Sequence, residues 1–302
     1  TACAAAGLDI EVQVPVRNGV AVLPGVGAIS APGQDRTTIA VVDGRITATV
    51  DQPVHHLTAT WAGRGLRLGL DDVDPYRHGH HAPPAPRLTA ADLDRWRRLV
   101  DEAWQLLAGL APGRADELRA GLRTLVPLVQ LDQGSSRSAT IRHAFGMFGL
   151  TPPTSPTDLA VTLVHEFQHS KLSAILDLTP MTDPTDDRKF FAPWRVDPRP
   201  LSGLLQGVYA FVGVADMWHA LRDVPGVQAT AEREFAEARL QVDRGLDAVE
   251  QSHALTPAGE RLAAGMRATT DRLLAEPVTP AADRAARETL ALIHERWLVH
   301  NN

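Results

Sequence analysis

Apolar and polar residues alternate between turn signals over the first quarter of the chain, from about residue 8 to residue 74. The run Ile10-Glu11-Val12-Gln13-Val14 has the two-residue period of a β-strand, and the alternating stretch 37–50 is interrupted by the turn pair Asp43-Gly44. This pattern predicts short antiparallel strands joined by hairpins. A loop rich in Pro and His, residues 74–86, follows and predicts a boundary.

Beyond that loop the apolar period becomes helical. Thr89 and Asp92 predict a helix cap, and apolar residues then recur three and four positions apart as far as Leu107. Residues 126–131 and 139–150 are predicted strands. Ser155, followed by Pro156 and Asp158, predicts the start of a helix that reaches about residue 178.

Four further helices are predicted in the last third of the chain. They cover residues 201–221, 229–252, 256–274 and 281–299, with Pro and Gly near their joints. The predicted fold is therefore α+β. A β-rich N-terminal part at residues 1–87 precedes a mainly helical part at residues 88–302.

Composition and charge narrow the function classes. With 302 residues, 44% of them hydrophobic, the chain is long enough to bury a sizeable core. A net charge of −6 and the lack of a basic run argue against nucleic-acid binding. The apolar stretches are shorter than the roughly 20 residues of a membrane-spanning helix, so no membrane partner is expected.

The ends and the cysteine content suggest where the chain works. Cys3 is the only cysteine, which excludes an intramolecular disulfide and a cysteine-based zinc cluster, and we expect a cytoplasmic location. The first residue is Thr1, with neither an initiating Met nor a signal pattern. We therefore expect an end processed or excised from a longer protein.

One motif in the predicted helix 155–178 carries chemistry. His165 and His169 are four residues apart, so a helix presents both imidazoles on one face, with Glu166 beside them. Apolar residues flank the motif on both sides, and polar groups among them are costly to bury unless paired or metal-bound. The sequence predicts a metal site in a zincin-like HExxH domain. The plain alternative is an exposed polar face without metal.

The third ligand separates the candidate chemistries. A metzincin would carry Gly at position 172 and His at position 175, where this chain has Leu172 and Ile175. A thermolysin-like peptidase takes a Glu from a downstream helix, but no Glu lies between His169 and Glu232. The metzincin class is excluded, and the usual zinc peptidase ligand set is in doubt.

Three segments carry a resemblance to a known family. They are HEFQHSKL at residues 165–172, FFAPWRVDPRPLSGLLQGVYAF at residues 190–211 and SSRS at residues 135–138. Together they resemble the HExxH-type, 2-oxoglutarate-dependent peptide β-hydroxylases, closely over about residues 120–225. The resemblance implies Fe(II), 2-oxoglutarate and O2 as cofactor and cosubstrates. The implied partner is a ribosomally synthesised precursor peptide, hydroxylated at a β-carbon, and similar domains occur fused to radical-SAM maturases. A larger fusion, or action beside such a maturase, is therefore expected.

Roles follow for residues of the long segment. Gln206 is a candidate third metal ligand through its amide oxygen, with an orienting or packing role as its alternative. Three acids, Asp177, Asp187 and Asp216, remain other candidates for that ligand. Arg195 and Arg199 offer planar forks for the distal carboxylate of 2-oxoglutarate, and structural ion pairs are the alternative.

Several other residues have two interpretations. Glu166 would be a general base in a peptidase, but in an oxygenase it only orients water, a ligand or substrate. Tyr209 follows Gln206 by three residues and either donates a hydrogen bond into the site or packs in the core. The predicted strand 139–150 offers an edge to an extended peptide. The cluster His78, His80 and His81 is interpreted as a solvated loop.

Three functions are weighed. The leading prediction is an Fe(II)/2-oxoglutarate-dependent peptide hydroxylase. A zinc metallopeptidase is the hydrolase alternative, and zinc is also a possible substitute metal. A peptide-binding module with a structural metal is the third.

Overall fold

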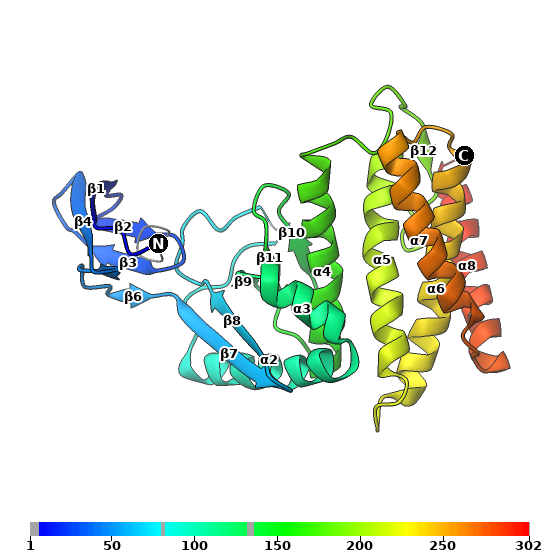
Figure 1. Ribbon diagram of the computed structural model, residues 1–302, viewed down its shortest axis with the longest axis horizontal. Coiled ribbons are helices and arrows are strands. Elements are labelled where there is room, and N and C mark those ends of the chain that lie inside the picture. Colours follow the sequence, from blue (N-terminus) through cyan, green and yellow to red (C-terminus); the bar gives the residue numbers. More distant parts are fainter. Residues whose placement is uncertain (1–5, 80–81, 132–135, 302) are drawn as a thin grey trace.

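The computed structural model describes residues 6–79, 82–131 and 136–301. Helices make up 48% and strands 20%, so the fold is mixed α+β, with a β-rich N-terminal part and a helical C-terminal part. Figure 1 shows the N-terminal strands at one end, the long helices at the other, and a sheet with one helix across it between them. None of the helices in the described ranges is long and apolar enough to cross a membrane.

The first strands form two small antiparallel sheets. One has the order β1 (Ile10–Pro15), β4 (Arg36–Val42) and β5 (Arg45–Ile46), and the other has β2 (Val20–Leu23), β3 (Gly27–Ser30) and β6 (Gln52–Pro53). The predicted turn at Asp43-Gly44 is confirmed, because both residues have positive φ, 50° and 71°. Little core lies between these sheets: one cluster contains only Val16, Ala21 and Ala31.

A five-stranded sheet occupies the middle of the molecule. Its order is β10 (Ser138–Thr140), β11 (Met147–Leu150), β9 (Thr124–Pro127), β8 (Arg64–Leu70) and β7 (His55–Trp61). The pairs β11–β9 and β9–β8 are parallel, whereas the two outer pairs are antiparallel. The sheet takes strands from both sides of residue 87, where the sequence predicts a domain boundary, and it leaves β10 at one edge.

Two predictions in this region are corrected. Residues 139–150 form two strands, because the chain turns back at Gly146, whose φ is 73°. A Cβ there would lie 2.1 Å from the carbonyl oxygen of Gly121, a contact between distant residues that no local pattern reveals. The predicted strand 126–131 begins two residues earlier and ends at Pro127. Helix α3 (Pro112–Gly121), which lacks an apolar stripe, was not predicted.

Helix α2 (Ala90–Leu110) begins at the predicted cap. The Thr89 hydroxyl accepts from the Asp92 amide and the Asp92 carboxylate accepts from the Thr89 amide, so both halves of the capping box form. The buried side of this helix, which includes Trp96, Trp104 and Leu107, packs on β7 and on the helix that carries the histidine motif.

That helix is α4 (Pro156–Leu176), and α5 (Leu201–Leu221) packs along it. Ser155 caps α4 by accepting from the Asp158 amide, as the sequence predicts. Gly213 of α5 lets the two helices approach, since a Cβ there would lie 2.8 Å from Gln168 and 3.0 Å from Val164. This close packing fixes the register of α5 against α4, and thereby what faces the histidines.

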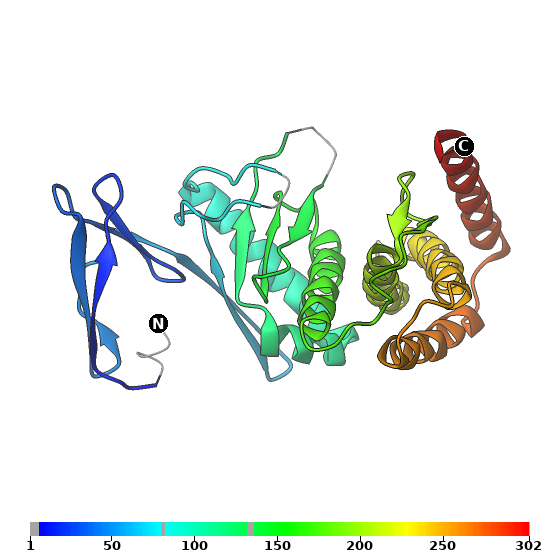
Figure 2. The ribbon, with the colours of Figure 1, turned by 90° about the horizontal axis from the view of Figure 1, so that it is seen from above.

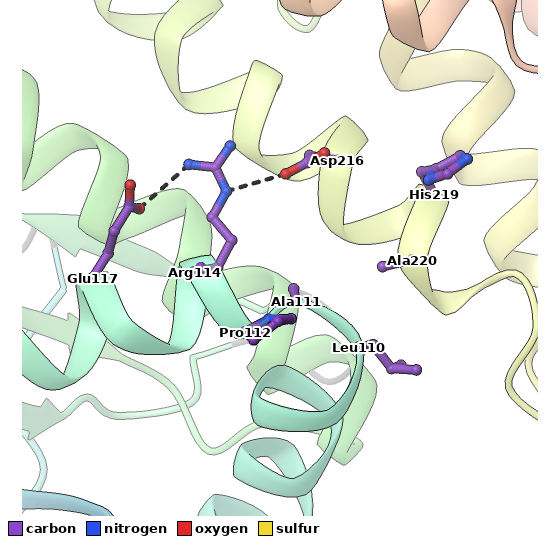
Figure 3. A pocket seen from close by; sticks show the side chains of 9 residues that line it. Leu110, Ala111, Pro112, Arg114, Glu117, Asp216, His219 and Ala220 are labelled. Atoms are coloured by element: carbon purple, nitrogen blue, oxygen red, sulfur yellow. Dashed lines mark hydrogen bonds and ion pairs between the residues drawn. The ribbon is translucent and has the colours of Figure 1, made fainter. Parts of the chain in front are cut away.

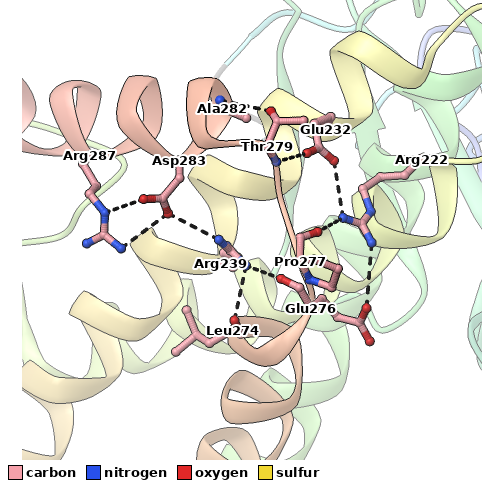
Figure 4. A network of polar contacts seen from close by, with 10 residues as sticks. All are labelled: Arg222, Glu232, Arg239, Leu274, Glu276, Pro277, Thr279, Ala282, Asp283 and Arg287. Carbon is pink, nitrogen blue, oxygen red and sulfur yellow. Dashed lines mark hydrogen bonds and ion pairs between the residues drawn. The ribbon is translucent and has the colours of Figure 1, made fainter.

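Three helices complete the far end: α6 (Gln228–Gln251), α7 (Pro257–Ala275) and α8 (Pro280–Asn301). Figure 2 shows α8 at the end away from the N-terminal strands. Arg239, only 6% exposed, donates to the carbonyl oxygens of Leu274 and Glu276 and pairs with Asp283 of α8 (Figure 4). One buried guanidinium thus ends α7 and holds the start of α8.

Candidate metal centre

His165 and His169 face one another on α4. Their Nε2 atoms lie 3.1 Å apart, and the rings meet edge to face with centroids 4.7 Å apart. Two imidazole nitrogens bound to one ion at about 2.0–2.1 Å lie roughly 2.8–3.4 Å from each other. The separation fits two ligands of a single ion, as the spacing in the sequence predicts.

The aromatic ring of Phe211 packs against His165, and that of Trp194 packs against Phe211. The His165 ring meets Phe211 edge to face at 5.5 Å between centroids, and Phe211 stacks on Trp194 at 4.6 Å. Gly207 makes room for Trp194, because a Cβ there would lie 2.0 Å from the indole. Trp194 therefore packs against Phe211 and Gly207.

The pKa of His165 is lowered to about 4, first by burial and then by the charge of a protonated His169, although Glu166 raises it. The imidazole of His165 is therefore neutral at pH 7. A neutral imidazole with a lone pair on Nε2 is the form that binds a metal.

Gln206 lies beside His169, next to the ring nitrogen Nδ1 and not next to the Nε2 that faces His165. Its Oε1 is 3.2 Å from Nδ1 of His169, and its Nε2 donates to the Ser173 hydroxyl at 3.4 Å. A proton on Nδ1 donated to this amide oxygen leaves Nε2 of His169 as the lone-pair nitrogen. Gln206 is thus placed to orient His169, and its amide oxygen does not face the gap between the two Nε2 atoms.

Glu166 is 2% exposed and joins the helix to the edge strand. Its Oε1 accepts from the Ser138 hydroxyl at 2.7 Å, and its Oε2 accepts from the Thr140 hydroxyl at 2.5 Å. Its Oε1 also lies 3.9 Å from Nε2 of His165. The carboxylate therefore has a structural task and a position next to the histidines. Two hydroxyls on alternate residues before the motif are the only sequence signal for this cradle.

No acid completes a conventional ligand set. The described residues contain no group of three His, Cys, Asp or Glu side chains that could hold a metal. Asp177 pairs with Arg142 at 3.0 Å and Asp216 pairs with Arg114 at 3.2 Å. Asp187 is exposed on the loop after α4.

The two candidate arginines differ. Arg195 pairs with Asp197 through two nitrogens, each 2.7 Å from an oxygen, near the surface. Arg199, in β13 (Arg199–Pro200), is half-buried, and its guanidinium packs on Gly203, where a Cβ would lie 3.1 Å from Nε. Within the described ranges the Arg199 guanidinium has no hydrogen-bond or ion-pair partner, and it lies near the Asp197 carboxylate, whose pKa is lowered first by Arg195 and also by Arg199. Of the two guanidinium groups, that of Arg199 is the one that can still bind a carboxylate of a ligand.

Tyr209 belongs to a different cluster, which the sequence did not predict; Figure 3 shows its members Arg114, Glu117 and Asp216. Its ring lies under the ammonium of Lys171, 5.7 Å from the centroid, and its carbonyl oxygen accepts from Gln168. Burial raises the pKa of Tyr209, so the phenol is neutral. Arg114 binds Asp216, Glu117 and Gln168 in the same cluster.

A cleft of about 680 Å³ lies between β10 and the first turns of α4, ahead of the histidine motif. It is lined by Ser138 of the edge strand, by Val161 and Thr162 one turn before the motif, and by Trp218 and Glu234 from α5 and α6. The cleft therefore opens along β10, the strand that holds Glu166.

Of the loop histidines His78, His80 and His81, the structure describes His78 alone. His78 is exposed in the loop after β8. His80 and His81, like Ser135 of the segment 135–138, lie outside the described residues.

Comparison of the chain with protein-family models and with curated proteins gave no match.

Proposed function

We propose that the chain is an Fe(II)/2-oxoglutarate-dependent hydroxylase that acts on a ribosomally made peptide. The observation that carries the proposal is the facing Nε2 pair of His165 and His169, one imidazole neutral and the other with an acceptor on Nδ1. This arrangement suits a divalent metal with two protein ligands, and leaves its other positions to small molecules.

When bound, iron, 2-oxoglutarate and O2 convert one peptide C–H bond to C–OH, while 2-oxoglutarate loses CO2 and becomes succinate, each product taking one oxygen atom. The chain's own part is to bind and orient. His165 and His169 hold the metal, and Gln206 fixes the ring of His169 through Nδ1.

Arg199 would hold the distal carboxylate of 2-oxoglutarate. Its guanidinium rests on Gly203, and Gly203 lies one turn before Gln206 on the same face of α5. The open fork therefore lies on the helix face that also meets His169. A carboxylate shielded from water needs such a partner, and a planar guanidinium binds it through two nitrogens.

The peptide would lie along β10. The Thr151 amide donates to the carbonyl of Arg137 at 2.9 Å, so the next main-chain groups in the antiparallel alternation, at Ser138 and Thr140, turn toward the open edge. An extended peptide added there runs past the cleft and past Glu166, and strand addition gives affinity through main-chain hydrogen bonds.

A zinc peptidase is the second candidate, because the Glu166 carboxylate lies 3.9 Å from Nε2 of His165. A general base must reach the water that it activates. Both Glu166 oxygens already accept hydroxyl hydrogen bonds, and no third acidic or imidazole ligand joins the pair within the described ranges. The first fact favours the oxygenase, whereas the missing third ligand departs from the usual ligand set of both enzyme classes.

Anaerobic titration distinguishes the two reactions. Adding 2-oxoglutarate to the Fe(II)-loaded protein should produce a weak visible charge-transfer band, which Zn(II) does not give. Admitting O2 with a peptide library should then yield succinate and peptides heavier by one oxygen atom. No band and no succinate would contradict the oxygenase, and oxygen-independent peptide cleavage would establish the peptidase.

The arginine assignment has a matched pair of variants. Arg199→Lys keeps the charge but loses the fork, so the apparent affinity for 2-oxoglutarate should fall about tenfold while Fe(II) affinity stays nearly constant. Arg195→Lys should change neither, because that side chain pairs with Asp197. If both variants bound 2-oxoglutarate with equal affinity, the distal carboxylate would have to be held by a cationic residue other than Arg199.

A further inference from the structure

A second groove lies far from the histidines, between the N-terminal strands and the loop that follows β8. It has a volume of about 490 Å³. Its walls are mostly apolar, from Val20, Val22 and Ala28 on one side and Val73 and Pro75 on the other. Asn18 and Gln52 add two side-chain amides. An apolar trough with a few amides suits an extended peptide.

Two residues, Tyr76 and Arg17, distinguish this groove from the rest of the protein surface. Tyr76 lines it and is 76% exposed. Its turn is well held, because the Asp74 carboxylate accepts from the Tyr76 amide and the buried Asp71 carboxylate accepts from the amides of Val73 and Asp74. A large aromatic ring is thus presented to solvent on a fixed turn, as in many peptide-binding surfaces.

The other residue is Arg17, the only cation among the residues that line this groove. It precedes the Asn18-Gly19 turn, and it is exposed. Across residues 6–79, 82–131 and 136–301 its guanidinium has no hydrogen-bond or ion-pair partner. An unpaired cation in an apolar groove favours a ligand that brings a carboxylate.

The loop that borders the groove approaches the proposed substrate strand. The loop that carries Tyr76 reaches Gly79, where a Cβ would lie 3.6 Å from Ile141. Ile141 directly follows Thr140, which holds Glu166. In Figure 1 this loop runs between the N-terminal sheets and β10. A single extended chain can therefore follow the loop from one site to the other.

We propose that this groove docks an acidic segment of the peptide substrate, remote from the residue that is modified, with an acid at Arg17 and an apolar side chain against Tyr76. The proposal rests on the proposed peptide chemistry at His165 and His169. It assigns the N-terminal strands a role in substrate selection, since docking of one segment raises the effective concentration of the rest at the metal centre.

Fluorescence anisotropy tests the groove without metal. The probe is a fluorescein-labelled synthetic peptide in which Glu alternates with Leu and Phe, and its counterpart carries Lys in place of every Glu. With the full chain in EDTA, the acidic probe should bind, more weakly at high salt, and the lysine probe should not. Arg17→Glu should weaken acidic-probe binding about tenfold, and Tyr76→Ala about fivefold.

Matched variants separate docking from general charge. Arg45→Glu removes an exposed cation of the same N-terminal sheets outside the groove, and it should leave binding unchanged. His165→Ala should also bind normally, so a failed oxygenase assay leaves this result intact. Equal binding of both probes, equal losses in Arg17→Glu and Arg45→Glu, or lost binding in His165→Ala would each overturn the proposal.

Discussion

Helix α4 carries two polar clusters that differ in how their polar groups are paired. Around Gln168 and Lys171 every charge has a partner: Arg114 contacts Asp216, Glu117 and Gln168, and Lys171 contacts Glu117 at 2.8 Å. The histidine pair next to it has two nitrogens that face each other at 3.1 Å. The first cluster pairs its cations with carboxylates of the chain, whereas the second places two imidazole nitrogens where both can bind one cation.

The difference separates stability from binding. A buried polar group that is satisfied by the protein contributes to the fold, and removing its partner leaves an unpaired group that is costly. A neutral His165 imidazole beside His169, whose Nδ1 lies next to the Gln206 amide oxygen, stabilises the fold little, but the pair can gain much from a divalent cation. We therefore expect variants of the two clusters to affect different measurements.

The largest effect is expected at the histidine pair. His165→Ala or His169→Ala should remove stoichiometric Co(II) or Fe(II) binding, because one imidazole cannot hold the ion alone, while the melting temperature changes little. Metal analysis after gel filtration measures the stoichiometry. His219→Ala is the control, since that imidazole lies near the C-terminal end of α5, 3.3 Å from the Glu276 carboxylate at the end of α7. Full occupancy in both variants would contradict the site.

A smaller effect, of the opposite kind, is expected at the paired cluster. Arg114→Met should lower the free energy of unfolding by about 1–2 kcal/mol, because Asp216 and Glu117 keep Arg272 and Lys171 but lose a shared partner whose side chain is 18% exposed. Metal affinity should stay constant. Urea unfolding measures the first quantity, and Arg98→Met, an exposed change on α2, should stay within about 0.5 kcal/mol. If Arg114→Met also lowered metal affinity, the two clusters would have to be treated as one functional unit.

The sequence predicted those features whose signals are local. Caps at Thr89 and Ser155 and the apolar period of the long helices place α2, α4 and α5 within a few residues. The histidine pair follows from the same helical period. Helix α3 has no apolar stripe, and the turn at Gly146 depends on contact with Gly121, so neither could be predicted.

The rest of the site depends on how distant elements meet. Arg114 and Asp216 are 102 residues apart and come together because α3 and α5 both pack against α4. The pairing of Arg195 with Asp197 leaves Arg199 open, but two arginines in one loop look equivalent in sequence. Which side of His169 receives Gln206 is set by the register of α5 on α4, through Gly213.

That register gives the last and smallest prediction. Gln206→Leu keeps the volume of the side chain but removes the acceptor from Nδ1 of His169, so the affinity for Co(II) or Zn(II) should fall about 10- to 100-fold with the stoichiometry still at one ion. Gln206→Glu should restore affinity, because a carboxylate accepts the same hydrogen bond. Competition with a chromogenic chelator measures both variants, and Gln241→Leu, which removes a contact to Glu237 within α6, is the control. If Gln206 were instead a direct ligand, Gln206→Leu would lose the ion as completely as His169→Ala, and the comparison between an orienting amide and a binding imidazole would fail.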